Sequence, residues 1–156
     1  MLCGRANSDK LEQCQSYLAC DPANCTTLDC SDSSLTGTLP SSLGDLVLLN
    51  SLYLEHNSLT GPIPTELGKL TAVKAMYLGY NSLDGAIPTE IGALAELTSM
   101  NLGYNSLDGA IPTEIGALAE LTSIEFSLNQ LSGTLPTELW ALPKVYWMCV
   151  PAKLRA

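Results

Sequence analysis

Short runs in which apolar residues alternate with others recur along the chain, as in Leu52-Tyr53-Leu54 and Ile124-Glu125-Phe126. Alternation with a period of two predicts short strands that bury one face. Each run is followed by Asn, then by Leu-x-Gly, an apolar residue and Pro. These residues predict a turn, an extended segment that the Pro ends, and a short helical or 3-10 turn. Thr or Ser beside the Pro is the candidate cap of that turn, and Glu lies near the positive end of its dipole.

The whole pattern repeats every 24 residues, and Asn57, Asn81, Asn105 and Asn129 mark the steps. The stretch from Leu78 to Ser99 recurs letter for letter from Leu102 to Ser123, and an earlier copy has Ser33 in the Asn position. Each Asn amide is expected to bond its own turn and the backbone of the next coil, which forms a ladder. A single coil cannot bury its apolar side alone, so the coils must stack around one continuous core.

The frames LYLEHNSLTGPIPTELGKL and MYLGYNSLDGAIPTEIGAL resemble the plant-type leucine-rich repeat family, whose pattern is LxxLxxLxLxxNxLxGxIPxxLGxL. The resemblance implies an α/β solenoid, which is a curved right-handed array with a parallel sheet on its concave face. It also implies a second strip made by the Gly-x-Ile-Pro segments and short helical or 3-10 turns on the convex side. Related arrays are receptor-kinase ectodomains and polygalacturonase-inhibitor-like proteins, which favours recognition outside the cytoplasm.

Three parts are predicted along the chain. Residues 1–24 are expected to form a cysteine-rich helical N-terminal cap, with Leu11, Cys14 and Leu18 on one helix face. Residues 25–144 are expected to hold five 24-residue repeats, and residues 145–156 a partial last coil without a full cap.

The charge balance changes which partners are plausible. Lys and Arg number 7 against 16 Asp and Glu, which gives a net charge of −9. Such a chain repels phosphate backbones and anionic lipid surfaces, so neither nucleic acid nor a membrane is an expected partner. No apolar run approaches the roughly 20 residues that span a bilayer, and the sequence as given shows no secretory signal.

Five of the six cysteines lie in the first thirty residues. This clustering favours disulfides, and therefore an extracellular or organelle-lumen location, over a zinc site, because the spacings lack paired CxxC motifs. The pairing is not predicted. By register Cys149 takes the outward strand position that Glu125 holds one coil earlier, so it is expected to be accessible.

Outward strand positions are the expected binding surface for a protein or peptide partner, because Tyr offers rigid amphipathic contact area. The candidate binding residues are Tyr53, Glu55, His56, Tyr77, Tyr80, Asn101, Tyr104, Glu125 and Trp147. The alternative is that exposed Tyr only reflects strand propensity. His56 beside Glu55 suggests a proton-transfer pair, but a solvated loop residue is the favoured interpretation. No nucleophile elbow, phosphate loop or metal-ligand spacing occurs, so the chain is expected to be neither an enzyme nor a cofactor protein.

Two further surfaces carry alternative functions. A convex column of Glu66, Glu90, Glu114 and Glu138 is interpreted as a solvated face, and the adjoining Thr column raises ice binding as a minor possibility. The C-terminal segment holds Trp140, Tyr146 and Trp147 where a polar cap is expected, which predicts a docking surface, a homodimer contact or a truncated array. The main hypothesis is therefore a non-enzymatic interaction module that binds through its concave face or this open end, and the alternative is a structural subunit of a larger assembly.

Overall fold

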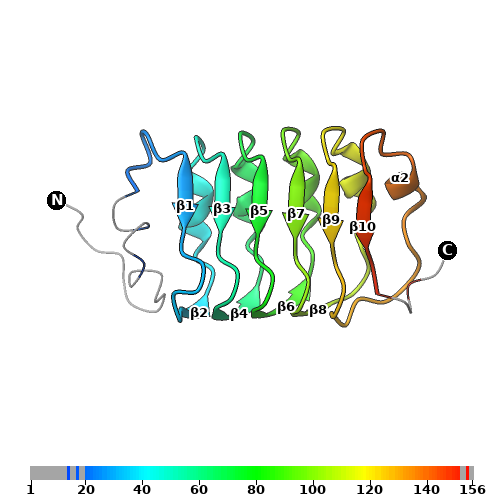
Figure 1. Cartoon of the computed structure of the whole chain (residues 1–156), viewed down its shortest axis with the longest axis horizontal. Coiled ribbons are helices and arrows are strands. Elements are labelled where there is room, and N and C mark those ends of the chain that lie inside the picture. Colours follow the sequence, from blue (N-terminus) through cyan, green and yellow to red (C-terminus); the bar gives the residue numbers. More distant parts are fainter. Residues whose placement is uncertain (1–13, 15–16, 18–19, 152–153, 155–156) are drawn as a thin grey trace.

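A row of stacked coils makes up the molecule (Figure 1). The structure is a computed structural model and describes residues 14, 17, 20–151 and 154. Six strands form one parallel sheet in the order β1-β3-β5-β7-β9-β10. They are β1 (Thr27–Asp29), β3 (Ser51–Tyr53), β5 (Ala75–Tyr77), β7 (Ser99–Asn101), β9 (Ser123–Glu125) and β10 (Trp147–Cys149). Each residue pairs with the residue one repeat later, as Leu52 does with Met76, which confirms the predicted solenoid.

A second parallel sheet runs along one edge of the coils in the order β2-β4-β6-β8 (Figure 1). Its strands are β2 (Thr36–Thr38), β4 (Ser58–Pro62), β6 (Ser82–Ala86) and β8 (Ser106–Asp108). Strands β4 and β6 cover the Ser-Leu-x-Gly residues, and all four strands end before the Ile-Pro or Leu-Pro pair, so the expected Gly-x-Ile-Pro position was slightly too late. The reason is that the Pro, which lacks an N–H group, already holds the N-cap position of the turn that follows.

Short turns close each coil behind the six-stranded sheet (Figure 1). They are the 3-10 turns η2 (Ser41–Asp45), η3 (Thr65–Lys69), η4 (Thr89–Ala93) and η5 (Thr113–Ala117) and the helix α2 (Thr137–Trp140). The predicted Thr or Ser cap is wrong, because Pro is the N-cap residue and no side chain caps the turn. Thr89, the first residue inside η4, instead donates its hydroxyl to Glu90 Oε2 at 3.3 Å. The acidic residue in the first turn is as predicted.

Glycine is required where successive turns stack. A Cβ atom on Gly68 would lie 2.6 Å from the carbonyl oxygen of Glu90, and one on Gly92 would lie 2.6 Å from that of Glu114. Because the neighbouring atom is backbone, it cannot rotate out of the way. The Gly of the Thr-Glu-x-Gly sequence therefore sets how closely the coils approach on this side.

The core is a continuous column of aliphatic side chains. Each coil contributes the same positions, such as Leu52, Leu54, Leu59 and Leu67 in one coil, all fully buried. Phe126 replaces the corresponding Leu in a later coil and is also fully buried. Removing one such side chain from water contributes roughly 1.5–3 kcal/mol, so the stacking of coils is the main source of stability. Within the described part of the chain, no charged residue is buried.

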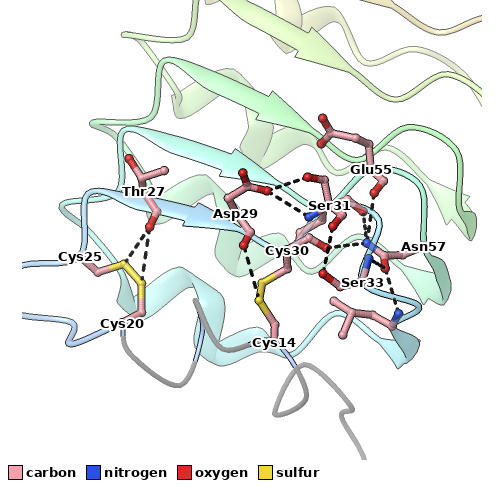
Figure 2. The surroundings of a disulfide bond; sticks show 12 residues. Cys14, Cys20, Cys25, Thr27, Asp29, Cys30, Ser31, Ser33, Glu55 and Asn57 are labelled. Atoms are coloured by element: carbon pink, nitrogen blue, oxygen red, sulfur yellow. Dashed lines mark hydrogen bonds between the residues drawn. A yellow bond between two sulfur atoms is a disulfide. The ribbon is translucent and has the colours of Figure 1, made fainter.

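The Asn ladder forms, but in the opposite direction from the one expected. Asn57 donates through Nδ2 to the carbonyl oxygens of Leu54 in its own coil, at 3.0 Å, and of Cys30 in the preceding coil, at 2.8 Å (Figure 2). Its Oδ1 accepts from the backbone N–H of Leu35, again in the preceding coil, at 2.9 Å. Asn81, Asn105 and Asn129 repeat these bonds. Each Asn therefore fastens the coil before it, not the coil after it.

Two disulfides, Cys14–Cys30 and Cys20–Cys25, hold the N-terminal segment to the first coil (Figure 2). They confirm the prediction of disulfides over zinc. Cys14 is buried in the core, whereas the predicted helix face with Leu11 and Leu18 falls outside the described residues, as does Cys3. In the described segments Cys149 is unpaired, half-buried and in register with Glu125. The three-part division of the chain stays a prediction.

Candidate functional site

The outer face of the six-stranded sheet, here called the concave face, carries two rows of side chains on its strands. By register these rows are Thr27-Ser51-Ala75-Ser99-Ser123-Trp147 and Asp29-Tyr53-Tyr77-Asn101-Glu125-Cys149. The residue between them in each strand is buried, or half-buried in β10. Period-two alternation is therefore sufficient to place these side chains on one face.

Beyond the strand ends, three rings from consecutive coils stack on one another, and we call His56, Tyr80 and Tyr104 the aromatic row. The ring centroids of His56 and Tyr80 are 4.3 Å apart with planes at 16°, and those of Tyr80 and Tyr104 are 4.1 Å apart at 13°. Tyr80 and Tyr104 are 41% and 44% exposed. Since stacking covers the ring faces, the row presents ring edges and hydroxyl groups to solvent.

The backbone explains why these rings stack. His56, Tyr80 and Tyr104 have φ values of 57°, 55° and 56°, in the left-handed region that side chains other than Asn, Asp and Gly seldom adopt. Each directly precedes the ladder Asn, and the N–H of Tyr80 donates to the carbonyl oxygen of Gly103 in the next coil at 3.0 Å. These ladder bonds set a coil spacing close to the stacking distance of aromatic rings. Asp32 and Leu128 take the same conformation before and after the row.

A second aromatic pair lies on the strands themselves. Tyr53 and Tyr77 have ring centroids 5.3 Å apart and planes tilted at 58°. The Tyr77 hydroxyl is 3.0 Å from Ser99 Oγ in the next coil. Both rings are half-buried, so this pair forms a less exposed surface than the aromatic row.

Two acceptor side chains, Asn101 and Glu125, continue the strand row of Tyr53 and Tyr77 into the next two coils. Asn101 Oδ1 accepts from the N–H of Gly103 at 2.9 Å, and Glu125 Oε1 accepts from the N–H of Ser127 at 2.7 Å. A Cβ atom on Gly79 would lie 2.7 Å from Asn101 Oδ1, and one on Gly103 would lie 2.7 Å from Glu125 Cγ. The two glycines therefore make room for Asn101 and Glu125 over the backbone of the preceding coil.

Glu55 is a partly buried acid of this face. Its Oε2 is buried and has no hydrogen-bond partner. Burial raises the pKa of the Glu55 carboxyl above its ordinary value, and the charges of Asp29 and Asp32 add to this, against the opposing effects of its own backbone hydrogen bond and of His56. The His56 ring stacks on Tyr80, so a Glu55–His56 proton-transfer pair has no support in the geometry.

Hydroxyl contact perturbs the aromatic row as well. The hydrogen bond with Tyr104 raises the pKa of the Tyr80 hydroxyl, and desolvation and the negative charges of Tyr104 and Glu125 act in the same direction. Tyr80 therefore remains a neutral hydrogen-bonding group at physiological pH.

The candidate residues are brought together only in part. The structure joins His56 to Tyr80 and Tyr104, and Tyr53 to Tyr77, while Trp147 lies on the last strand, two strands beyond the strand of Asn101. Sequence reasoning missed the stack and the acceptor contacts. The signal for the stack was the aromatic residue directly before Asn in consecutive coils.

Surfaces away from the concave face give weaker candidates for a binding site. A hollow of about 430 Å³ on the turn side is lined by Thr65, Glu66, Gly68, Lys69, Glu90 and Ala93. In the part of the chain that the structure describes, no group of three or more His, Cys, Asp or Glu side chains is arranged to hold a metal ion. Across the same residues, no helix has the length and apolar character to cross a membrane.

Comparison with known proteins defines the class. The family model described as Leucine Rich Repeat matches residues 24–46, 48–70 and 96–118. No curated protein sequence matches the chain significantly. Together with the two parallel sheets and the Asn ladder, these repeats and the structural likenesses below match a plant-type leucine-rich repeat protein.

Several solved structures of plant proteins are similar to this chain. The plant peptide hormone receptor RGFR1, solved in complex with RGF2, is 36% identical with a TM-score of 0.76, covering 78% of this chain and 20% of that chain. The GASSHO1/SCHENGEN3 receptor kinase ectodomain of Arabidopsis thaliana, solved in complex with CASPARIAN STRIP INTEGRITY FACTOR 2, is 36% identical with a TM-score of 0.81, covering 83% and 16%. A plant ice-binding protein is 30% identical with a TM-score of 0.74, covering 79% and 41%. The chain thus spans about a fifth or less of the length of the two receptors.

Proposed function

We propose that this chain binds a protein or peptide through its concave face, without chemistry of its own, and that the partner presents basic side chains. The binding surface consists of the aromatic row, the Tyr53–Tyr77 pair and the acids beside them. Trp147 extends this surface along the last strand. The two disulfides and the likeness to receptor ectodomains support an extracellular or lumenal setting.

The observation that carries the proposal is the position of Tyr80 and Tyr104. Strand β5 ends at Tyr77 and β7 at Asn101, so neither tyrosine lies in a strand. Strand propensity therefore does not account for them, although it does account for Tyr53 and Tyr77. A left-handed backbone costs a Tyr roughly 1–2 kcal/mol, and stacking within the row offsets part of that cost. An exposed row of rings maintained at this cost is expected of a recognition surface.

Charge selects the kind of partner. The outward positions of the face include four acids, Asp29, Asp32, Glu55 and Glu125. Neither Lys nor Arg occurs at these positions, and His56 is the single His among them. Ring edges and carboxylates side by side suit the guanidinium of Arg, which offers a planar array of donors. The likeness to the plant peptide hormone receptor RGFR1, solved in complex with RGF2, agrees with a peptide as the occupant.

The test uses two fluorescent synthetic peptides of equal length, one alternating Arg and Ser and one alternating Glu and Ser. Fluorescence anisotropy should show binding of the Arg peptide only, and added salt should weaken it. Tyr80→Ser and Tyr104→Ser should each weaken binding roughly fivefold or more, as expected for anchor residues. Leu48→Ser, a substitution of an exposed apolar residue outside the face, is the matched control.

Two results would contradict this proposal. Equal affinity for both peptides would remove the charge argument. Unchanged affinity in Tyr80→Ser and Tyr104→Ser would remove the aromatic row from the binding surface.

Ice binding is a second candidate, favoured by the likeness to a plant ice-binding protein. The regular Thr column is the surface it would use, but Thr65, Thr89, Thr113 and Thr137 each donate a hydroxyl bond to the adjacent Glu at 3.3–3.4 Å. Carboxylates beside each hydroxyl bind liquid water strongly, so this column is a poor template for ice. Thermal hysteresis of the isolated chain, lost in Thr89→Val, is the result that would favour this candidate over peptide binding.

A further inference from the structure

A candidate modification site lies in the loop that leads into strand β1. Asn24-Cys25-Thr26 has the form Asn-x-Thr with a residue other than Pro in the middle, which is the acceptor motif for N-linked glycosylation. No other Asn of the given sequence has Ser or Thr two residues later, and each ladder Asn has Leu at that position. The motif therefore marks Asn24 alone.

The fold exposes both groups that define this motif. Asn24 and Thr26 are exposed, whereas Cys25 between them is buried and joined to Cys20 (Figure 2). This alternation indicates that the Asn24 amide and the Thr26 hydroxyl face the same, solvated side of the loop. Neither side chain hydrogen-bonds to a residue that the structure describes. A transferase that contacts Asn and Thr together can therefore reach both, and an attached sugar has room in the folded chain.

The same position in a later coil shows what distinguishes the first coil. Asn24-Cys25-Thr26 aligns with Glu96-Leu97-Thr98, so Asn replaces an acid here. The Thr98 hydroxyl donates to the carbonyl oxygen of Lys74 in the preceding coil at 2.8 Å. Thr26 makes no such bond within the described segments, so its hydroxyl is available to an enzyme.

An exposed apolar pair follows the motif by one repeat. Val47 and Leu48 are 48% and 46% exposed, and Leu48 is the repeat equivalent of Asn24. Because Thr27 pairs with Ser51 in this register, the two loops are neighbours. The next three coils have Thr-Ala, Ala-Glu and Ala-Glu in place of this pair. A bulky hydrophilic group on Asn24 would thus shield an apolar surface that those coils lack.

From these observations we propose that Asn24 is an N-glycosylation site. The inference rests on the extracellular or lumenal setting given under the proposed function, because an acceptor motif of this kind is used in secreted chains. The Asn24 Nδ2 forms a bond to C1 of the first sugar of a lipid-pyrophosphate-linked oligosaccharide. The bond from that carbon to the pyrophosphate oxygen breaks, the lipid pyrophosphate leaves with the electron pair, and one amide proton passes to solvent.

The glycan leaves the aromatic row uncovered. Asn24 precedes β1, which begins at Thr27, whereas His56 follows β3, which ends at Tyr53. Because these strands are parallel, the two residues lie at opposite ends of the strands. The chain with and without its glycan should therefore bind the Arg peptide equally. Absence of peptide binding would contradict the proposed function and leave the Asn24 site standing, and absence of the glycan would do the reverse.

Secretion of the full chain from a eukaryotic host tests the site. A cleavable leader placed before residue 1 sends the chain through the compartment where glycans are transferred, so the result does not depend on the natural location. Mass spectrometry should show one N-linked glycan added to the 16.5 kDa chain. Peptide N-glycosidase should remove it and leave Asp at the modified position. Asn24→Gln and Thr26→Val should each abolish the added mass.

Two further variants are the controls. Thr27→Val makes the same change one residue later and should keep the glycan. Leu48→Asn with Asn50→Thr, in the Asn24→Gln background, moves the motif one repeat along and should restore one glycan. A natural chain that is secreted without a glycan, while this shifted motif is glycosylated in the same host, overturns the proposal. So does an added mass that persists in Asn24→Gln alone.

Discussion

Left-handed backbone at His56, Tyr80 and Tyr104 is what turns a repeat into a candidate site. At roughly 1–2 kcal/mol per residue, these three positions cost more than two stacked pairs return at about 0.5–1.5 kcal/mol each. The balance is supplied by the ladder bonds and the core on either side of the turn. A residue chosen for stability alone would be Asn, Asp or Gly, and Asp32 fits that rule in the first coil.

Glu55→Gln tests the other unusual residue of the face. The folded-state pKa of Glu55 lies above its ordinary value of 4.5, so the folded chain holds this proton more tightly than the unfolded chain does. Stability from Glu55 is therefore present below about pH 4.5 and is lost as pH rises through the raised folded pKa. Glu55→Gln should be more stable than the natural chain at pH 7, and the difference should vanish near pH 4.

Urea unfolding at both pH values measures this difference, with Glu96→Gln, an exposed carboxylate in another coil, as the control. If Glu55→Gln is instead less stable than the natural chain at pH 7, the contacts of the ionised carboxylate stabilise the fold by more than its burial costs.

At the scale of one element, the Asn turn is the unit that holds neighbouring coils together. Asn81→Ala would leave the carbonyl oxygens of Leu54 and Leu78 and the N–H of Leu59 without their side-chain partner. We expect a loss of about 2–4 kcal/mol in the free energy of unfolding, because several groups next to the core lose a bond at once. Chemical denaturation measures the loss.

Ser82→Ala, one residue later and exposed, is the control and should change stability little. Asn105→Ala should cost about as much as Asn81→Ala, since the two turns have identical sequences and equivalent bonds. A loss confined to one of the two would mean that position along the array matters more than the local bonds.

The sequence predicted the elements well where periodicity alone decides them. Alternation placed Tyr53, Tyr77 and Glu125 on one face, and the 24-residue step placed Cys149 beside Glu125. Prediction from the sequence failed where the same residues are compatible with two different local structures. Thr after Pro has the composition of a cap but lies inside the turn, and a repeat has no built-in indication of whether its Asn bonds the coil before or after it. Stacking in the aromatic row depends on a positive φ value, which cannot be predicted from a Tyr in the sequence because Tyr seldom adopts it.

At the scale of the whole molecule, the two identical coils make the array adjustable in length. Removing residues 80–103 joins Gly79 to Tyr104 and leaves the repeat sequence unbroken. Because coils contact only their neighbours, we expect a folded, shorter solenoid whose urea m-value is lower by roughly 15%, in proportion to the surface lost. Circular dichroism and urea titration measure both properties.

The same deletion shortens the aromatic row to His56 and Tyr104. If the proposed peptide binding is correct, the affinity for the Arg peptide should fall while the fold is retained. Loss of cooperative unfolding after the deletion would instead mean that the array needs all its coils, which is contrary to a nearest-neighbour solenoid.

The direction of the Asn ladder has a consequence for biosynthesis. Because Asn57, Asn81, Asn105 and Asn129 each bond the coil before them, a turn that has left the ribosome stays incomplete until the next 24 residues follow. The Leu59 N–H, for example, has no side-chain acceptor until Asn81 has been synthesised. Folding on the ribosome would therefore advance one coil behind synthesis, from the disulfide-bonded first coil onward, and each new coil would lock its predecessor.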